Sequence, residues 1–142
     1  MTESESGLLA EYPDVLRGAE VAEILRLDPR TVQRKANAGE LPAFRVGDGE
    51  RAEWRYETRR MVALIEGGDA WAVLPPLLGD RPAVLTTEEV AEILRFDRAT
   101  VASMAAEGAL PGAFKPGGGR TPWRFSTRAL SAVVTDAGRP AP

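Results

Sequence analysis

Apolar residues recur at helical spacing in two matching stretches of the chain. Each stretch has an apolar pair, a gap of one residue and a second apolar pair, which places the four side chains on one face of a helix. The four are Val21, Ala22, Ile24 and Leu25 in the first stretch, and Val90, Ala91, Ile93 and Leu94 in the second. Thr86, with Glu89 three residues later, forms a capping-box pattern, so a helix is expected to begin near Thr87. Gly18 is a weaker start for the first helix.

A second short helix is predicted after each of these stretches. Asp28 is a good N-cap, and Pro29 suits the first helical position because its missing N–H would be unpaired there anyway. Asp97 caps the counterpart. The two helices, with the glycines expected to end them, are 29–38 with Gly39 and 98–107 with Gly108. Two short helices joined by a tight turn indicate a helix-turn-helix, whose second helix usually enters the major groove of DNA.

Two strand-like runs and a last helix complete each stretch. The runs flank a glycine-containing turn, which is the pattern of a β-hairpin. They are 44–46 and 53–56 in the first stretch, and 113–115 and 122–125 in the second. Last helices are expected over 58–66 and 127–136. The order predicts a mainly α fold with small β-hairpin wings, a winged helix-turn-helix that occurs twice.

The two stretches are copies of each other at a constant offset of 69 residues. A repeat of this length is too long for a solenoid unit and long enough for a small domain. Two linked copies favour a function that gains from bivalency. The predicted segments are a flexible acidic N-terminus (1–12), module 1 (13–67), an apolar connector (68–81), module 2 (82–137) and a C-terminal tail (138–142).

The connector is not a flexible Gly/Ser tether. Pro75-Pro76 stiffens its centre, and its apolar side chains are expected to pack between the modules and fix their relative orientation. These side chains are Trp71, Val73, Leu74, Leu77 and Leu78.

Composition narrows the function further. The 142 residues include no cysteine and no histidine, which removes thiolate metal sites, the usual general base and the commonest zinc ligand. We therefore expect neither an enzyme nor a cofactor. No run of about 20 apolar residues and no signal-peptide pattern is present, so a cytoplasmic protein without a membrane partner is expected. The net charge of −3 does not favour nucleic acid, but the acidity lies partly outside the modules: residues 13–67 are neutral and residues 81–142 carry +2.

The repeated motifs resemble those of a known family. E-V-A-E-I-L-R-x-D-x-x-T-V, then G-x-L-P, then W-R-[YF] is similar to the excisionase-like and MerR-like DNA-binding domains, over about 13–67 and again over 82–136. The resemblance implies a second helix that reads the major groove and a wing that contacts the minor groove or the backbone. It also implies a role as a transcription regulator or a recombination directionality factor, and some members bind head-to-tail on direct repeats.

Candidate DNA-contacting residues in module 1 lie on its second helix and wing. Arginine can bond guanine bidentately, and glutamine can do so with adenine. Arg34 and Gln33 are therefore expected at bases, and Arg30 and Lys35 at phosphates. The remaining candidates are Thr31, Arg45, Arg51 and Arg55. The alternative for each is that it merely solvates an exposed face. Val32, Ala36, Val101 and Ala105 are expected to pack inward, and Trp54 and Trp123 to anchor the core or wing.

Module 2 is poorer in base-reading side chains. Gln33, Arg34 and Lys35 correspond to Ala102, Ser103 and Met104. Its candidate contacts are Arg98, Thr100, Ser103, Lys115, Arg120 and Arg124. Met104 and Ala106 are interpreted as an apolar face for a protein partner, or as one covered by module 1. Module 2 is thus either a weaker DNA reader or a partner-binding module.

The leading hypothesis is sequence-specific binding of double-stranded DNA at adjacent direct half-sites by two tandem winged helix-turn-helix modules. The alternative is a protein-interaction adaptor on the same scaffold that has lost most of its DNA binding.

Overall fold

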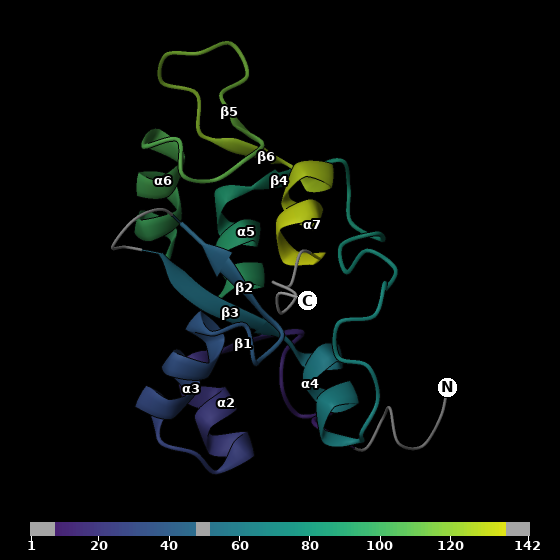
Figure 1. The fold of residues 1–142 in the computed structure, drawn as a ribbon. Helices are drawn as coiled ribbons and strands as arrows, with labels where there is room; N and C mark the ends of the chain where they lie inside the picture. The colour runs from purple at the N-terminus through teal and green to yellow at the C-terminus, as the bar shows by residue number, and fades with distance from the viewer. Residues whose placement is uncertain (1–7, 48–51, 136–142) are drawn as a thin grey trace. The chain divides into compact units, whose positions relative to one another are not determined.

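The computed structural model describes residues 8–47 and 52–135. This part of the chain divides into two compact units. The same series of elements occurs twice in it, and the names module 1 and module 2 are kept for the two series (Figure 1). The structure confirms the predicted class, with three helices and a small three-stranded sheet in each module of the described chain.

Each module is a winged helix-turn-helix. The elements of module 1 are β1 (Val15–Arg17), α2 (Gly18–Leu25), α3 (Pro29–Asn37), β2 (Ala43–Val46), β3 (Glu53–Glu57) and α4 (Thr58–Ile65). Those of module 2 are β4 (Val84–Thr86), α5 (Thr87–Leu94), α6 (Arg98–Ala106), β5 (Ala113–Phe114), β6 (Arg124–Ser126) and α7 (Thr127–Thr135). The predicted helices are confirmed to within two residues at their ends, except that Asp136, the predicted end of the last helix, lies outside the described residues.

One strand in each module was not predicted. β1 pairs with β3 antiparallel, with Leu16 opposite Tyr56, and β4 pairs with β6, with Leu85 opposite Phe125. The sheet orders are therefore β1-β3-β2 and β4-β6-β5. A three-residue strand is too short to show an alternating pattern, and its partner lies about 40 residues away in sequence. Pairing within the folded module, and not a local signal, defines these strands.

The helix ends follow the predicted capping. Asp28 Oδ1 accepts from the Arg30 amide at 2.8 Å, and Asp97 Oδ1 accepts from the Thr100 amide at 2.7 Å. The hydrogen bonds from Thr100 hold the pKa of Asp97 below its ordinary value. Both halves of the Thr86–Glu89 capping box are present, at 3.1 and 2.9 Å.

The tight turn between the first two helices uses the left-handed region of backbone conformation. Arg26 and Arg95 occupy matching positions with φ of 58° and 65°. This conformation costs a non-glycine residue about 1 kcal/mol or more. Since both modules adopt it at the same place, the turn geometry is a property of the repeated scaffold.

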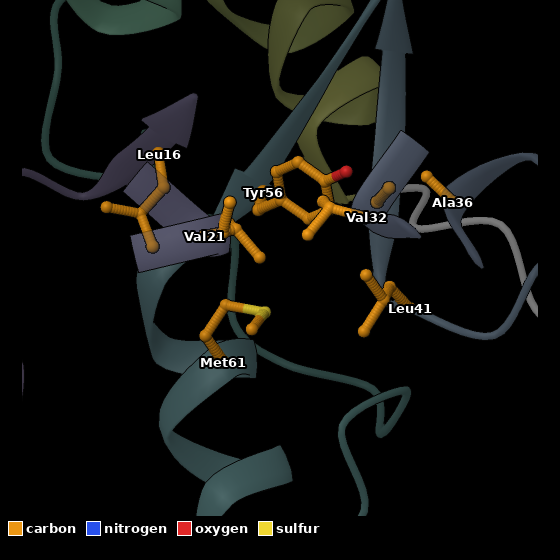
Figure 2. Packing of buried hydrophobic residues seen from close by; sticks show 9 residues of the cluster. Leu16, Val21, Val32, Ala36, Leu41, Tyr56 and Met61 are labelled. Carbon is orange, nitrogen blue, oxygen red and sulfur yellow. The ribbon is translucent and has the colours of Figure 1, made fainter. Parts of the chain in front are cut away.

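A buried cluster holds the helix-turn-helix of module 1 against its sheet. In module 1, Figure 2 shows Tyr56 among aliphatic side chains from the helices and the loop before β2. Burial raises the pKa of Tyr56 to about 12, although the Arg55 charge acts in the opposite direction. The four residues predicted to face inward, Val32, Ala36, Val101 and Ala105, are all buried. The second helices therefore present their remaining faces outward.

A buried ion pair fixes the start of the connector in module 1. Glu57 is fully buried and accepts from Arg60 Nε at 2.6 Å. The Arg60 guanidinium also donates to the carbonyl oxygens of Ala70 and Ala72, at 3.0 and 2.9 Å. Residues just after α4 are thus held to it by a side chain that has no counterpart in module 2, where Ala129 takes the place of Arg60.

The connector only partly follows its prediction. Leu78 is buried, and Trp71, Leu74 and Leu77 are half-buried. Val73, however, is 93% exposed, so the prediction that it packs was wrong. One of the boundaries in sequence between the two compact units falls between Val73 and Leu74. The role of the connector in orienting the modules stays a prediction.

Candidate nucleic-acid interface

The outward face of α3 is polar and basic. Val32 and Ala36 face the core, and the side chains of Arg30, Gln33 and Arg34 are exposed. Gln33 and Arg34 follow Arg30 by three and four residues, so all three share one side of the helix. No acidic residue occurs within α3. The fold therefore displays two guanidinium groups and an amide on the helix that a winged helix-turn-helix inserts into the major groove.

Two other predicted residues of α3 are less exposed. Thr31 is half-buried. Lys35 forms an ion pair with Glu40 at 3.2 Å, with side-chain exposures of 37% and 58%. A pair this exposed contributes little to stability, so a phosphate can compete for the ammonium. Lys35 thus remains suited to a backbone contact.

The wing of module 1 is anchored to α3. Trp54 Nε1 donates to Asn37 Oδ1 at 2.8 Å, and the half-buried ring packs against the core. The prediction that Trp54 is an anchor is confirmed. Because the bond joins residues 17 positions apart, nothing in the local sequence pattern indicates it.

The predicted wing arginines of module 1 have different environments. Arg45 is exposed on β2 between two buried residues. Arg51 lies outside the described residues. Arg55 is only 3% exposed, and its Nη1 donates to the Trp54 carbonyl at 3.0 Å. Its burial removes it from the surface, so Arg55 is not part of the interface proposed below.

The helix α6 offers fewer groups to DNA than α3. Arg98 is exposed, and its Nη1 lies 3.9 Å from Glu88 Oε2. Ser103 is exposed and Thr100 is half-buried. Met104 is only 3% exposed. The interpretation of Met104 as part of an exposed apolar face for a protein partner was therefore wrong, because its side chain is buried. Ala106 alone of that pair is exposed.

The wing of module 2 is basic and rich in glycine. Gly117, Gly118 and Gly119 have φ of 82°, 68° and 62°, a run of left-handed conformations that glycine adopts without strain. The resulting β5–β6 loop extends beyond the helices of its module (Figure 1). The sequence from 113 to 126 contains no acidic residue. It contains three basic residues, Lys115, Arg120 and Arg124.

Two of these cations contact the wing itself. Lys115 Nζ lies 5.0 Å from the centre of the Trp123 ring and donates to the Gly119 carbonyl at 3.2 Å. Arg124 is half-buried and donates to the Trp123 carbonyl at 2.9 Å. Arg120 is exposed on the loop. The contact between Lys115 and Trp123 was not predicted, and it gives Trp123 an anchoring role within the wing.

This geometry defines a protein of the winged helix-turn-helix class in which the module is built twice. The family model described as Helix-turn-helix domain matches residues 15–69 and again residues 84–137. The chain therefore belongs to this excisionase-like helix-turn-helix family, in two tandem copies. Neither the comparison with curated proteins nor that with solved structures gives a match.

Membership of this family indicates DNA binding, and the family is typically non-enzymatic. Within residues 8–47 and 52–135, no helix is long and apolar enough to cross a membrane.

Proposed function

We propose that the protein binds double-stranded DNA sequence-specifically, with an unequal division of labour between its modules. The observation that carries the proposal is the outward face of α3, where Arg30, Gln33 and Arg34 are exposed opposite a buried apolar face. A helix of this kind, braced by a sheet and followed by a wing, has the shape and the donors that major-groove recognition requires.

Module 1 is the sequence reader. Arg34 and Gln33 lie in the first two turns of α3, where base contacts fall in this motif, and they offer bidentate donors to guanine and adenine. Arg30, Lys35 and Arg45 are assigned to phosphates, which set register without reading sequence.

Module 2 is the weaker reader and holds DNA chiefly through its wing. Its α6 carries one cation, Arg98, whereas α3 carries three. Its glycine-rich loop allows close approach of the backbone to a phosphate, with Arg120 and Lys115 beside it. Arg124, Thr100 and Ser103 complete the proposed contacts of this module.

The two modules engage adjacent direct half-sites about one helical turn apart. Covalent linkage raises the effective concentration of the second module, so each can be individually weak. This offsets the unfavourable net charge of −3. The biological role is transcriptional regulation or control of site-specific recombination, with regulation preferred because an architectural excision factor is usually more basic.

The second candidate is a protein-interaction adaptor. The outward face of α6 favours the adaptor function, because its exposed small side chains offer few groups that can read DNA. These side chains are Ala99, Ser103 and Ala106. The burial of Met104 weakens it, because a large apolar anchor for a partner is lost from that face.

Titration of a labelled duplex pool by fluorescence anisotropy at about 50 and about 200 mM salt separates the two candidates. We expect binding at low salt and a steep loss with salt, followed by enrichment of particular sequences when the bound fraction is sequenced. The variant Arg30→Ala/Arg34→Ala should bind more weakly and lose the enrichment, because the wing of module 2 still holds DNA without reading its sequence. The control Arg26→Gln, at an exposed arginine in the turn before α3, should lose neither. Absence of binding at low salt would exclude the DNA-binding proposal.

A further inference from the structure

A groove in module 2 lies away from the proposed DNA contacts. It has a volume of about 480 Å³ and runs between residues 76–83 and the last helix, α7. Pro76, Leu78 and Ala83 line it from the first segment, and Ala132 lines it from α7. Its volume is within the range of about 300 to 1,000 Å³ that small-molecule sites occupy.

Two guanidinium groups of the groove are without a partner among the residues that the structure describes. Arg81 and Arg128 are exposed, and within the described residues neither guanidinium has an ion pair or a side-chain hydrogen bond. The hydroxyl of Ser131, a residue that also lines the groove, is itself shielded from water and has no hydrogen-bond partner within residues 8–47 and 52–135. A buried hydroxyl without a partner is unfavourable, and buried polar groups are normally paired. Among the lining residues that the structure describes, none is acidic.

We propose that this groove binds a small organic carboxylate with an apolar body. The apolar body would cover the surface formed by Leu78, Ala83 and Ala132. The carboxylate would be held by the two guanidinium groups, which suit carboxylates because they offer several N–H donors in a fixed plane. Charge complementarity selects an anion over a neutral compound, and the size of the groove selects a small molecule over a folded partner.

The site is independent of the DNA contacts. None of its lining residues belongs to α5, α6 or the wing, and the proposal stands whether or not the protein binds DNA.

The test uses two probes that share one apolar body. 2-Naphthoate and neutral 2-naphthalenemethanol are titrated into the ¹⁵N-labelled full chain without DNA, and amide chemical shifts are followed. Naphthoate should give saturable shifts centred on Ala83, Ser131 and Ala132, and the alcohol should bind at least tenfold more weakly. Equal affinity for the two probes, or shifts spread without a centre, would overturn the proposal.

Three variants sharpen the result. Arg81→Gln/Arg128→Gln should weaken naphthoate at least tenfold and leave the alcohol unchanged. Ala132→Phe places a ring in the groove from an exposed position and should abolish binding of both probes, while thermal unfolding verifies that the chain stays folded. Arg26→Gln in module 1 removes one exposed arginine elsewhere and should change nothing. Undiminished naphthoate binding by the double variant would show that the guanidinium groups do not form the site.

Discussion

The effect of a single cation on DNA binding depends on the group it meets. A side chain at a base edge determines which sequence is preferred, whereas one at a phosphate adds affinity to every sequence and makes it dependent on salt. Arg34 is exposed on α3 and Arg120 is exposed on the glycine-rich loop of module 2. The two positions therefore separate these effects within one chain.

We predict that Arg34→Ala relaxes the sequence preference and that Arg120→Ala does not. Loss of a bidentate base contact should cost about 1–3 kcal/mol at one base pair of the preferred site, with little change on other duplexes. Loss of a phosphate contact should weaken all duplexes alike and lower the salt slope by about 0.9. Titrations of preferred and scrambled duplexes at several salt concentrations measure both. Equal, sequence-independent losses for the two variants would refute this division of labour.

Tyr56 makes the stability of module 1 sensitive to alkaline pH. Burial raises its pKa to about 12, above the value of 10.0 for an exposed tyrosine. The folded state thus favours the neutral phenol. Its contribution to the free energy of unfolding is complete below pH 10 and is lost as the pH rises to about 12. Wild type should lose up to about 2–3 kcal/mol more than Tyr56→Phe between these pH values. Urea unfolding at a series of pH values tests this, and parallel profiles for the two proteins would contradict it.

Among elements, the buried Glu57–Arg60 pair is a feature of module 1 that module 2 lacks. Module 2 has Ser126 and Ala129 at the matching positions and folds in the same way. The pair is therefore not required by the scaffold. Its specific role in module 1 is to bind the carbonyl oxygens of Ala70 and Ala72.

We predict that Arg60→Ala destabilises module 1 by about 3–5 kcal/mol, because among the described residues it leaves the buried Glu57 carboxylate with only its ion pair to Arg59. The double variant Glu57→Ser/Arg60→Ala, which copies module 2, should recover part of that loss because it removes both charges. Chemical denaturation of the wild type, both single variants and the double variant gives the coupling energy. Additive losses would show that the two groups do not act as a pair.

The elements differ in how far the sequence could predict them. Helices α3 and α6 were predictable because Asp28, Pro29 and Asp97 are local signals that the fold obeys. Strands β1 and β4 were not, since they exist only through pairing with β3 and β6. Met104 was predicted to lie on an outward face because it occupies the position of Lys35. That position is already half-buried in module 1, and in module 2 the methionine side chain is buried.

For the whole molecule, the repeat joins two modules whose surface residues differ. The polar residues suited to reading bases gather on α3, and the wing free of acidic residues belongs to module 2. The sequence could predict this asymmetry because it depends on residue identity. The sequence could not predict which candidate side chains are exposed to DNA, because exposure depends on packing between distant segments. The burial of Arg55 is the example.

The connector between the modules provides the test of linked binding. We predict that inserting ten Gly/Ser residues between Val73 and Leu74 weakens binding to a duplex with two half-sites by about twofold or more, and broadens the half-site spacings that are tolerated. The physical reason is that a longer, more flexible linker lowers the effective concentration of the second module once the first is bound. The insertion point suits this test because Val73 is 93% exposed, so neither core is opened.

The matched control for the insertion is a duplex with one half-site, on which the affinity should not change because a single module engages it. Anisotropy titrations over duplexes whose half-sites are moved apart one base pair at a time give both affinity and spacing preference. If the insertion leaves the affinity and the spacing preference of the two-site duplex unaltered, the modules do not bind adjacent half-sites together. Module 1 would then be the sole DNA reader, and the duplication would have to be explained by another property of module 2, such as the proposed carboxylate site beside α7.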